Sequence, residues 1–231
     1  MSNNLIVILE IIVVFCLLLG AKKLFGKAGV QAWVCIASIL ANLITAKNAD
    51  ILGFSTAIGT VMFASTFLAT DILTECYGAK YARQSVFMGL ASTMVFIIAS
   101  QIALWYTPSA IDYADGAMQT LFSMNLRISV SSMVMYFVAN MADVYLYDAI
   151  RKRMDGRAMW LRNNISTILC NCLENFLFIG FAFWGIYTLD DILLIAISTS
   201  IIEIVVGLCD TPFLYLARRL RHGDEEAPVH G

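Results

Sequence analysis

The segment from Thr70 to Arg83, TDILTECYGAKYAR, brings acidic and basic side chains together at the end of a long apolar stretch. Asp71 and Glu75 lie four residues apart, so a helix would carry both carboxyl groups on one face. Two carboxylates on one helix face at a membrane boundary are costly unless they have partners. We therefore expect this segment to have a role beyond crossing the bilayer.

Further acids lie inside the apolar segments. With a rise of 1.5 Å per residue, Glu174 lies about 17 Å from the start of its predicted helix, and Glu203 lies about as far from the start of the next one. Asn140 and Asn171 are predicted at a similar depth. A charged group in the middle of a bilayer costs about 3 kcal/mol or more, so Glu174 and Glu203 are candidates for function.

These side chains belong to polar stripes, in which polar residues recur every three or four positions along five predicted helices. The stripes contain Ser38, Asn42 and Thr45; Thr56, Thr60, Thr66, Thr70, Asp71 and Thr74; Ser129, Ser132, Tyr136, Asn140, Asp143 and Tyr147; Asn164, Thr167, Asn171, Glu174 and Asn175; and Thr199, Glu203, Gly207 and Asp210. Because lipid-facing surfaces are apolar, the stripes should face one another around a polar interior. For the Ser and Thr residues we favour a structural role, in hydrogen bonds between helices worth about 0.6 kcal/mol each.

The composition of the chain indicates a membrane protein. Hydrophobic residues make up 60% and charged residues 14% of the sequence, and the mean hydropathy is +0.77. Soluble domains average about 45–50% apolar and about 25% charged residues. The net charge of −2 gives no sign of a nucleic-acid partner. We expect a single integral membrane domain over residues 1–221 and a disordered polar tail over 222–231.

The sequence lacks the motifs of the common enzyme and cofactor sites. It has no P-loop, GxSxG, HExxH or dinucleotide-binding glycine pattern. The six cysteines form no CxxC pair or Cys/His cluster, and both histidines lie in the tail, so neither a metal site nor a disulfide framework is supported. We expect no enzymatic activity, no cofactor and no metal, and we favour a small transporter or a membrane-embedded binding subunit.

Seven apolar segments are long enough to cross about 30 Å of hydrocarbon. They lie at 5–20, 28–46, 51–73, 85–106, 126–148, 163–187 and 191–217. Thirteen of the 15 Lys and Arg residues fall in alternate loops, and acidic residues occupy the opposite ones. The positive-inside rule then predicts a multi-pass plasma-membrane protein with its N-terminus outside and its C-terminus in the cytoplasm.

Three further positions leave alternatives open. Lys47 and Arg127 depart from the charge pattern at the outer ends of helices, and they either reach lipid headgroups or guard an outer mouth. The sequence Asp210-Thr-Pro is suited to start a helix, with Asp accepting backbone N–H groups. It predicts a break in the last span, which is either a packing kink or part of a site.

Four motifs together resemble a known family. They are ANLITAK at 41–47, DILTECYGAKYAR at 71–83, WLRNNIST at 160–167 and DTPF at 210–213. In this order they are similar to the queuosine precursor transporters, also described as vitamin uptake transporters, over roughly residues 30–217. The resemblance implies an all-α bundle of six membrane helices, like the substrate-binding subunits of energy-coupling-factor transporters, with one additional N-terminal helix.

The resemblance also implies uptake of 7-deazaguanine bases such as preQ0, preQ1 or queuine. Such a base presents a ring N–H beside an exocyclic amine, and one carboxylate can accept both. Glu174 with Asn171 is our candidate for this edge, and aromatic rings could stack on the base. The wider set of candidate binding residues is Asn42, Asn140, Asn171, Glu174, Asn175, Glu203 and Asp210, with Trp33, Tyr136 or Phe178 as the stacking ring and Glu203 or Asp210 as partner of a substrate amine.

The charged segment at the start of this section is then predicted at the cytoplasmic mouth. There Asp71 and Glu75 would form a gate by pairing with Arg83 or with the basic loop at 151–162. The alternatives are a transporter for another flat heterocycle, such as a vitamin or a purine, and a structural membrane subunit. The sequence leaves open the energy source, whether proton coupling, facilitated diffusion or a partner ATPase, and also the oligomeric state.

Overall fold

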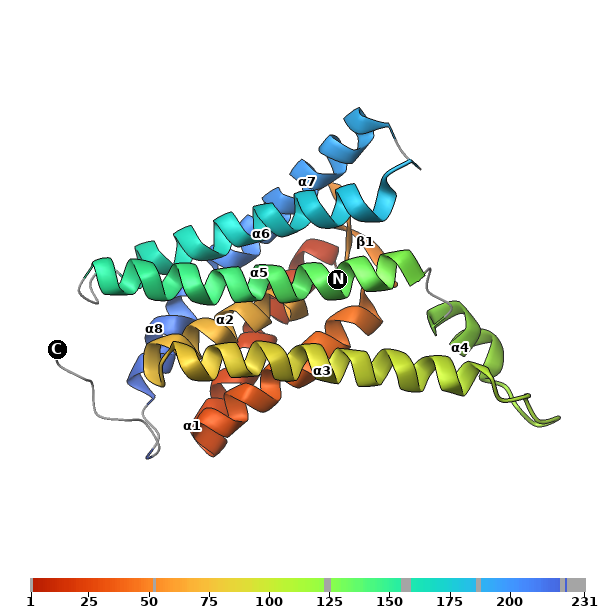
Figure 1. Ribbon diagram of the computed structural model, residues 1–231, viewed down its shortest axis with the longest axis horizontal. Helices are drawn as coiled ribbons and strands as arrows, with labels where there is room; N and C mark the ends of the chain where they lie inside the picture. The colour runs from red at the N-terminus through yellow and green to blue at the C-terminus, as the bar shows by residue number, and fades with distance from the viewer. Residues whose placement is uncertain are drawn as a thin grey trace.

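The computed structural model describes residues 2–51, 53–122, 126–154, 159–185, 188–220 and 223. Within these ranges the chain forms eight helices and one β-hairpin (Figure 1). The elements are α1 (Asn3–Ile44), β1 (Asn48–Ile51), β2 (Phe54–Ala57), α2 (Thr60–Cys76), α3 (Ala79–Leu104), α4 (Asp115–Phe122), α5 (Leu126–Arg153), α6 (Met159–Phe183), α7 (Leu189–Leu208) and α8 (Thr211–Arg219). The predicted tail at 222–231 lies outside the described residues, apart from Gly223.

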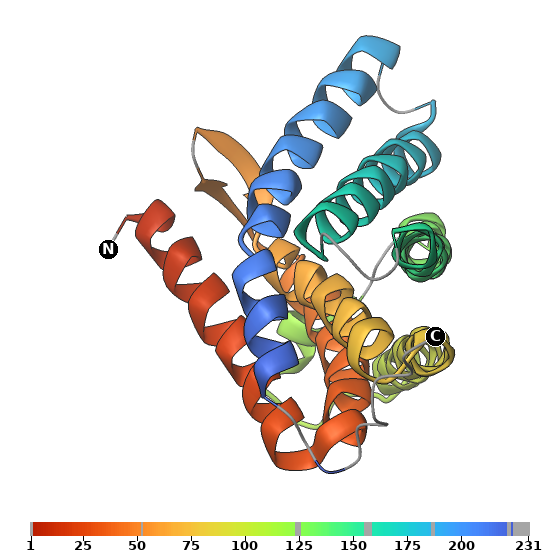
Figure 2. The same cartoon turned by 90° about the vertical axis from the view of Figure 1, so that its left-hand side faces the viewer.

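The first two predicted spans form one element, α1, which bends sharply at Gly26. This residue has φ 57° and ψ −136°, a backbone conformation that an L side chain rarely adopts. Figure 2 shows the two arms of α1 as a V, with the N-terminus at the tip of one arm. The two arms correspond to the first two predicted spans, although the turn between them is much shorter than we expected.

The third predicted span, 51–73, begins too early. Residues Asn48–Ala57 form an antiparallel hairpin, with Ile51 paired to Phe54 and Asn48 paired to Ala57. Gly53 has φ 87°, which lets the chain reverse between the strands. The helix α2 starts only at Thr60, so it is about 26 Å long.

Helix α2 lies at the centre of the bundle. Apart from Phe63, every side chain from Val61 to Thr74 is buried. The helix packs against α1 and α3 on one side and against α5, α7 and α8 on the other. Because it is surrounded, its Thr and Asp side chains must face other helices rather than lipid.

The other spans are close to the predictions, with two exceptions. Helix α4 lies between α3 and α5 and was not predicted. The last span, 191–217, is interrupted at Cys209 and Asp210 between α7 and α8, as the Asp-Thr-Pro sequence indicated. Asp210 does not cap α8, however, since its side chain makes no hydrogen bond to the first turn.

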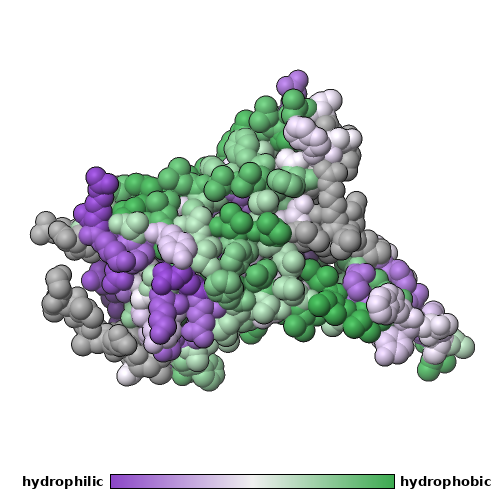
Figure 3. Space-filling view, viewed as in Figure 1, coloured by the Kyte–Doolittle hydropathy of each residue, from purple (hydrophilic) through white to green (hydrophobic). Residues whose placement is uncertain are grey.

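The described surface is that of a membrane protein. Four helical segments are long and apolar enough to cross a bilayer within the described ranges: α1, α3, Met159–Phe181 and Ile192–Arg219. Figure 3 shows hydrophobic side chains over the middle of the bundle and hydrophilic ones at the end where α5 stops and α3 starts, and around α4. The prediction of a helical membrane protein is confirmed.

Candidate functional site

A pocket of about 320 Å³ lies between five helices and the hairpin. Its walls come from the end of α1, the start of α2, the start of α5, the second half of α6 and the middle of α7, with Thr56 from β2. These parts meet at the end of the bundle that also carries the hairpin and α4 (Figure 1). Gly59 allows the close approach, since a Cβ there would lie 2.0 Å from Thr45 Oγ1 and 2.6 Å from the carbonyl oxygen of Ala41.

The acidic part of the pocket comes from α6 and α7. Asn175 Nδ2 donates to Glu203 Oε2 over 2.7 Å and to Ser200 Oγ over 3.3 Å, so both side chains are held in place. The neighbouring Glu174 also lines the pocket, and its Oε2 is buried without a hydrogen-bond partner. One carboxylate is therefore fixed by protein donors, while the other retains an acceptor for a ligand.

Aromatic rings and an amide also line the pocket. Phe63 and Tyr136 line the pocket with their ring centroids 6.1 Å apart in an edge-on arrangement, and Phe178 is a third aromatic lining residue. Asn42 is oriented by its donation to the carbonyl of Ser38 over 2.7 Å. A flat, polar, nitrogen-rich molecule would find stacking surfaces, an amide and a carboxylate here.

The predicted binding residues separate into two groups. Asn42, Glu174, Asn175 and Glu203 line the pocket. The other three are buried elsewhere and are not among its lining residues: Asn140, Asn171 and Asp210.

Contacts outside the pocket hold several of these side chains. Asn140 accepts a hydrogen bond from Thr66 and donates to the carbonyl of Tyr136. The indole of Trp33, a predicted stacking ring, donates to Ser65 Oγ and also lies outside the pocket lining.

A second polar cluster lies at the far end of α2 and centres on Glu75. The Glu75 carboxylate accepts a hydrogen bond from Arg162, lies 3.7 Å from Arg151 Nε and 3.6 Å from Arg218 Nη1, and accepts from the Tyr147 hydroxyl over 3.3 Å. Arg162 is fully buried. This cluster ties together the ends of α2, α5, α6 and α8.

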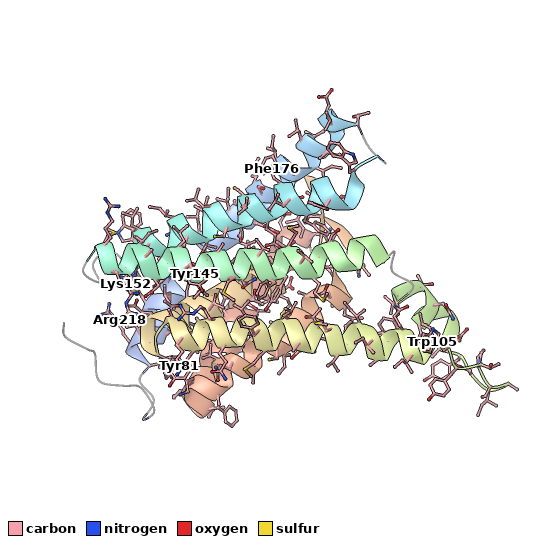
Figure 4. The ribbon with its side chains drawn as sticks, viewed as in Figure 1. Tyr81, Trp105, Tyr145, Lys152, Phe176 and Arg218 are labelled. Atoms are coloured by element: carbon pink, nitrogen blue, oxygen red, sulfur yellow. The ribbon has the colours of Figure 1, made fainter. Side chains whose placement is uncertain are left out.

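Basic side chains gather at this end of the molecule. Figure 4 places Lys152, Arg218 and Tyr81 there and Trp105 at the opposite end. Arg83 lies over the ring of Tyr145, 5.3 Å from its centroid, rather than beside an acid of the predicted gate. Lys47 is exposed next to the hairpin. The side chain of Arg127 lies outside the described residues.

Asp71 does not share the environment of Glu75, although both were predicted in one gate. Asp71 and Asp143 are fully buried, and their carboxyl groups face each other. Within the described ranges no hydrogen bond to any of their four oxygens is formed in good geometry, although the Ser166 hydroxyl faces Asp143. Asp210, from the break between α7 and α8, also faces this pair and accepts a hydrogen bond from Asn163 over 2.6 Å.

Two of these partners were missed in the sequence. Ser200 lies outside the predicted stripe of α7, and only the packing against Asn175 reveals it. Asn163 is part of the RNN motif, but the sequence contained no sign that it contacts Asp210. No group of three or more metal-ligating side chains occurs in the described ranges.

Comparison with known proteins places the chain. A family described as "Putative vitamin uptake transporter" matches residues 57–217. The chain belongs to this family. The match to the vitamin uptake transporter family covers α2 to α7 and most of α8, and so most of the pocket lining, the Asp71 cluster and all of the Glu75 cluster except Arg218.

Curated relatives of this family member carry more specific names. A "Probable queuosine precursor transporter" of Bacillus subtilis is 34% identical over 98% of this chain and 100% of its own length. The "Queuosine precursor transporter" of Escherichia coli is 29% identical over 66% of this chain and 68% of its own length. The resemblance that the motifs indicated is thus confirmed. No solved structure matches the chain.

The Bacillus subtilis alignment also bears on the first arm of α1. Because it covers 98% of this chain and the whole relative, the arm predicted as an addition to a six-helix unit is shared with that relative.

Proposed function

We propose that this chain imports queuosine precursors, the 7-deazaguanine bases, through the pocket between α1, α2, α5, α6 and α7. The observation that carries the proposal is that one pocket combines aromatic rings with a carboxylate, Glu174, whose Oε2 has no hydrogen-bond partner among the described residues. A volume of about 320 Å³ suits a small flat ligand. The names of the relatives support the same substrate class.

Glu174 is the proposed partner of the purine-like edge. A deazaguanine presents a ring N–H and an exocyclic amine side by side, and a carboxylate accepts both in a bidentate pair. Asn175 rather than Asn171 is the amide beside this group, since Asn171 does not line the pocket. Tyr136 and Phe178 would stack against the ring. Glu203 would attract an amine carried by the substrate, as in preQ1.

The proposed orientation follows from the basic end of the bundle. The ends of α2, α5 and α8, with Arg151, Lys152, Arg218 and Arg219, are assigned to the cytoplasm by the positive-inside rule. The pocket then lies on the outer side, and the Glu75 cluster lies between it and the cytoplasm. The N-terminus would be outside and the C-terminus inside. Likeness of the six helices after the first arm to energy-coupling-factor binding subunits is part of this proposal.

Uptake of a labelled 7-deazaguanine by the Glu174→Gln variant tests the proposal. The amide has one acceptor oxygen in place of two and directs an NH₂ group at a substrate donor. Loss of a charge-assisted hydrogen bond, worth about 1.5–3 kcal/mol, should lower the affinity about ten- to hundredfold. Glu10→Gln is the matched control, because Glu10 lies on the first arm of α1 and does not line the pocket. Wild-type uptake by Glu174→Gln would remove this residue from the proposal.

Two measurements distinguish the alternatives. Competition of labelled uptake by guanine tests whether the pocket takes purines in general. Thermal unfolding with and without the base tests binding itself, since a ligand at about 100 times its Kd stabilises the folded state by about 2.7 kcal/mol. A purely structural subunit would show no shift.

A further inference from the structure

The carboxyl pair of Asp71 and Asp143 lies in the interior of the bundle, away from the pocket. Both side chains have no exposed surface, and they contact each other across α2 and α5. The hydroxyl of Ser166, which faces Asp143 from α6, donates to the carbonyl oxygen of Asn163. Among the described residues no N–H or hydroxyl group donates to Asp71, and Asp143 faces only the Ser166 hydroxyl, so the pair is short of the donors that buried carboxylates require.

Hydrogen bonds between α2 and α5 on either side of Asp71 and Asp143 hold these two residues in place. One turn and a half before Asp71, Thr66 donates to Asn140 on α5. One turn after Asp71, Glu75 accepts from Tyr147 on α5. Because α2 and α5 run parallel between these two bonds, Asp71 and Asp143 are brought together by the register of the helices.

The charges around the pair increase the repulsion. The titratable and charged groups that face it or lie next to it are Glu75 on α2, Tyr147 and Arg151 on α5, Arg162 and Cys170 on α6, Asp210 before α8, and Arg218 on α8. The three arginines are all directed to Glu75. Among the described residues, Asp71 therefore faces two further aspartates and no cation is paired with it.

Two carboxylates in contact in a low-dielectric interior cannot both be ionised, because like charges at this distance disfavour each other strongly. A proton held between them supplies the missing donor: it forms an O–H bond to one carboxyl group and a hydrogen bond to the other. The geometry of two facing carboxyl groups without other donors therefore points to a proton as the ligand of this site.

We propose that Asp71 and Asp143 form the coupling site of a proton symporter, in which one proton enters the cell with each molecule of substrate; this rests on the proposed import function. The pair keeps one shared proton throughout. The transported proton forms an O–H bond at the remaining carboxylate and later breaks it, which restores that carboxylate with no change in oxidation state. With both protons bound the pair is neutral, so α2 and α5 can stay in contact while the substrate site changes access.

Helix α6 connects the two sites. Ser166 faces the carboxyl pair, and Glu174 lines the pocket about 12 Å further along the same helix. Cys170 lies between them and interacts electrostatically with Asp71, Asp143 and Glu174. A shift of α6 on substrate binding would therefore change the surroundings of Asp71 and Asp143, which would couple substrate binding to proton binding.

Transport by the full-length protein in liposomes tests the proposal. In the wild type, an inward proton gradient of one pH unit should raise the accumulation ratio of a labelled 7-deazaguanine about tenfold for one proton per substrate. A protonophore should abolish this gain, and a pH dye inside the vesicles should report acidification when substrate is added. Accumulation that ignores the proton gradient, or that follows a sodium gradient instead, would overturn the proposal.

The Asp71→Asn and Asp143→Asn variants separate coupling from transport. Exchange of labelled for unlabelled substrate needs no driving force, so it should persist in both variants while gradient-driven accumulation and acidification are lost. Absence of exchange in the wild type would instead contradict the proposed function.

Infrared difference spectra between acidic and alkaline buffer provide a readout that does not depend on transport. The carboxylic C=O band of the wild type should disappear in Asp71→Asn and remain in Glu10→Gln. An unchanged band in Asp71→Asn would refute the shared proton.

Discussion

The Glu75 cluster makes a quantitative prediction about stability. Arg162 is fully buried, and the Glu75 side chain that it contacts is only 5% exposed. Removing one partner of a buried ion pair costs about 3–5 kcal/mol, because the remaining charge is left in the interior. Loss of the contact between Arg162 and the Tyr147 ring, 5.4 Å from its centroid, adds about 0.5–1 kcal/mol.

For Arg162→Ala we expect a loss of stability near the low end of this range. Arg151 and Arg218 remain within 4 Å of Glu75, so the carboxylate would not be left without a cation. The free energy of unfolding should fall by about 3 kcal/mol, measured by titrating the purified protein in mixed micelles with SDS.

Arg218→Ala is the matched control for this measurement. Arg218 approaches the same carboxylate at 3.6 Å, but its side chain is 58% exposed. An exposed ion pair contributes about 0–1 kcal/mol, so this variant should be nearly as stable as the wild type. Equal destabilisation by the two arginine substitutions would refute the reasoning from burial.

Two further predictions concern α1. Gly26→Ala should destabilise the protein by about 1–3 kcal/mol in the same SDS titration, because φ 57° with ψ −136° is strained for any residue with a Cβ. Gly20→Ala is the control and should have little effect, because Gly20 lies within the first arm with open space around it. Lys22→Met should loosen α8, because Lys22 Nζ donates to the carbonyls of Ala217 and Leu220 over 2.6 and 2.8 Å. A protease should then cleave the chain faster after residue 217. An unchanged cleavage rate would contradict this prediction.

Local patterns were sufficient to predict where most of the long helices lie. Hydrophobic length depends on composition alone, so the spans that became α3, α5 and α6 could be located in the sequence to within a few residues. The hairpin was missed because residues 51–57 are apolar enough to extend the following helix. Their strand pairing depends on Gly53, whose positive φ is a local conformation that hydropathy does not encode.

The polar stripes predicted that their polar side chains face away from lipid, but not which other side chains they contact. Asn171 and Glu174 lie on one stripe, yet only Glu174 lines the pocket, because the rotation of α6 against α7 is set by packing. Ser200 joins the site for the same reason.

Asp71 and Glu75 show most clearly what the sequence determines and what only the tertiary structure decides. From the sequence alone, Asp71 and Glu75 share a helix face at the end of an apolar span, and nothing distinguishes their roles. Their partners lie 72 to 143 positions further along the chain, on α5, α6 and α8. Helix packing delivers arginines to Glu75 and a second carboxyl group to Asp71. The sequence thus determined that both acids need partners, and only the tertiary structure decided that one received cations and the other an acid, since contacts between distant helices depend on their mutual register.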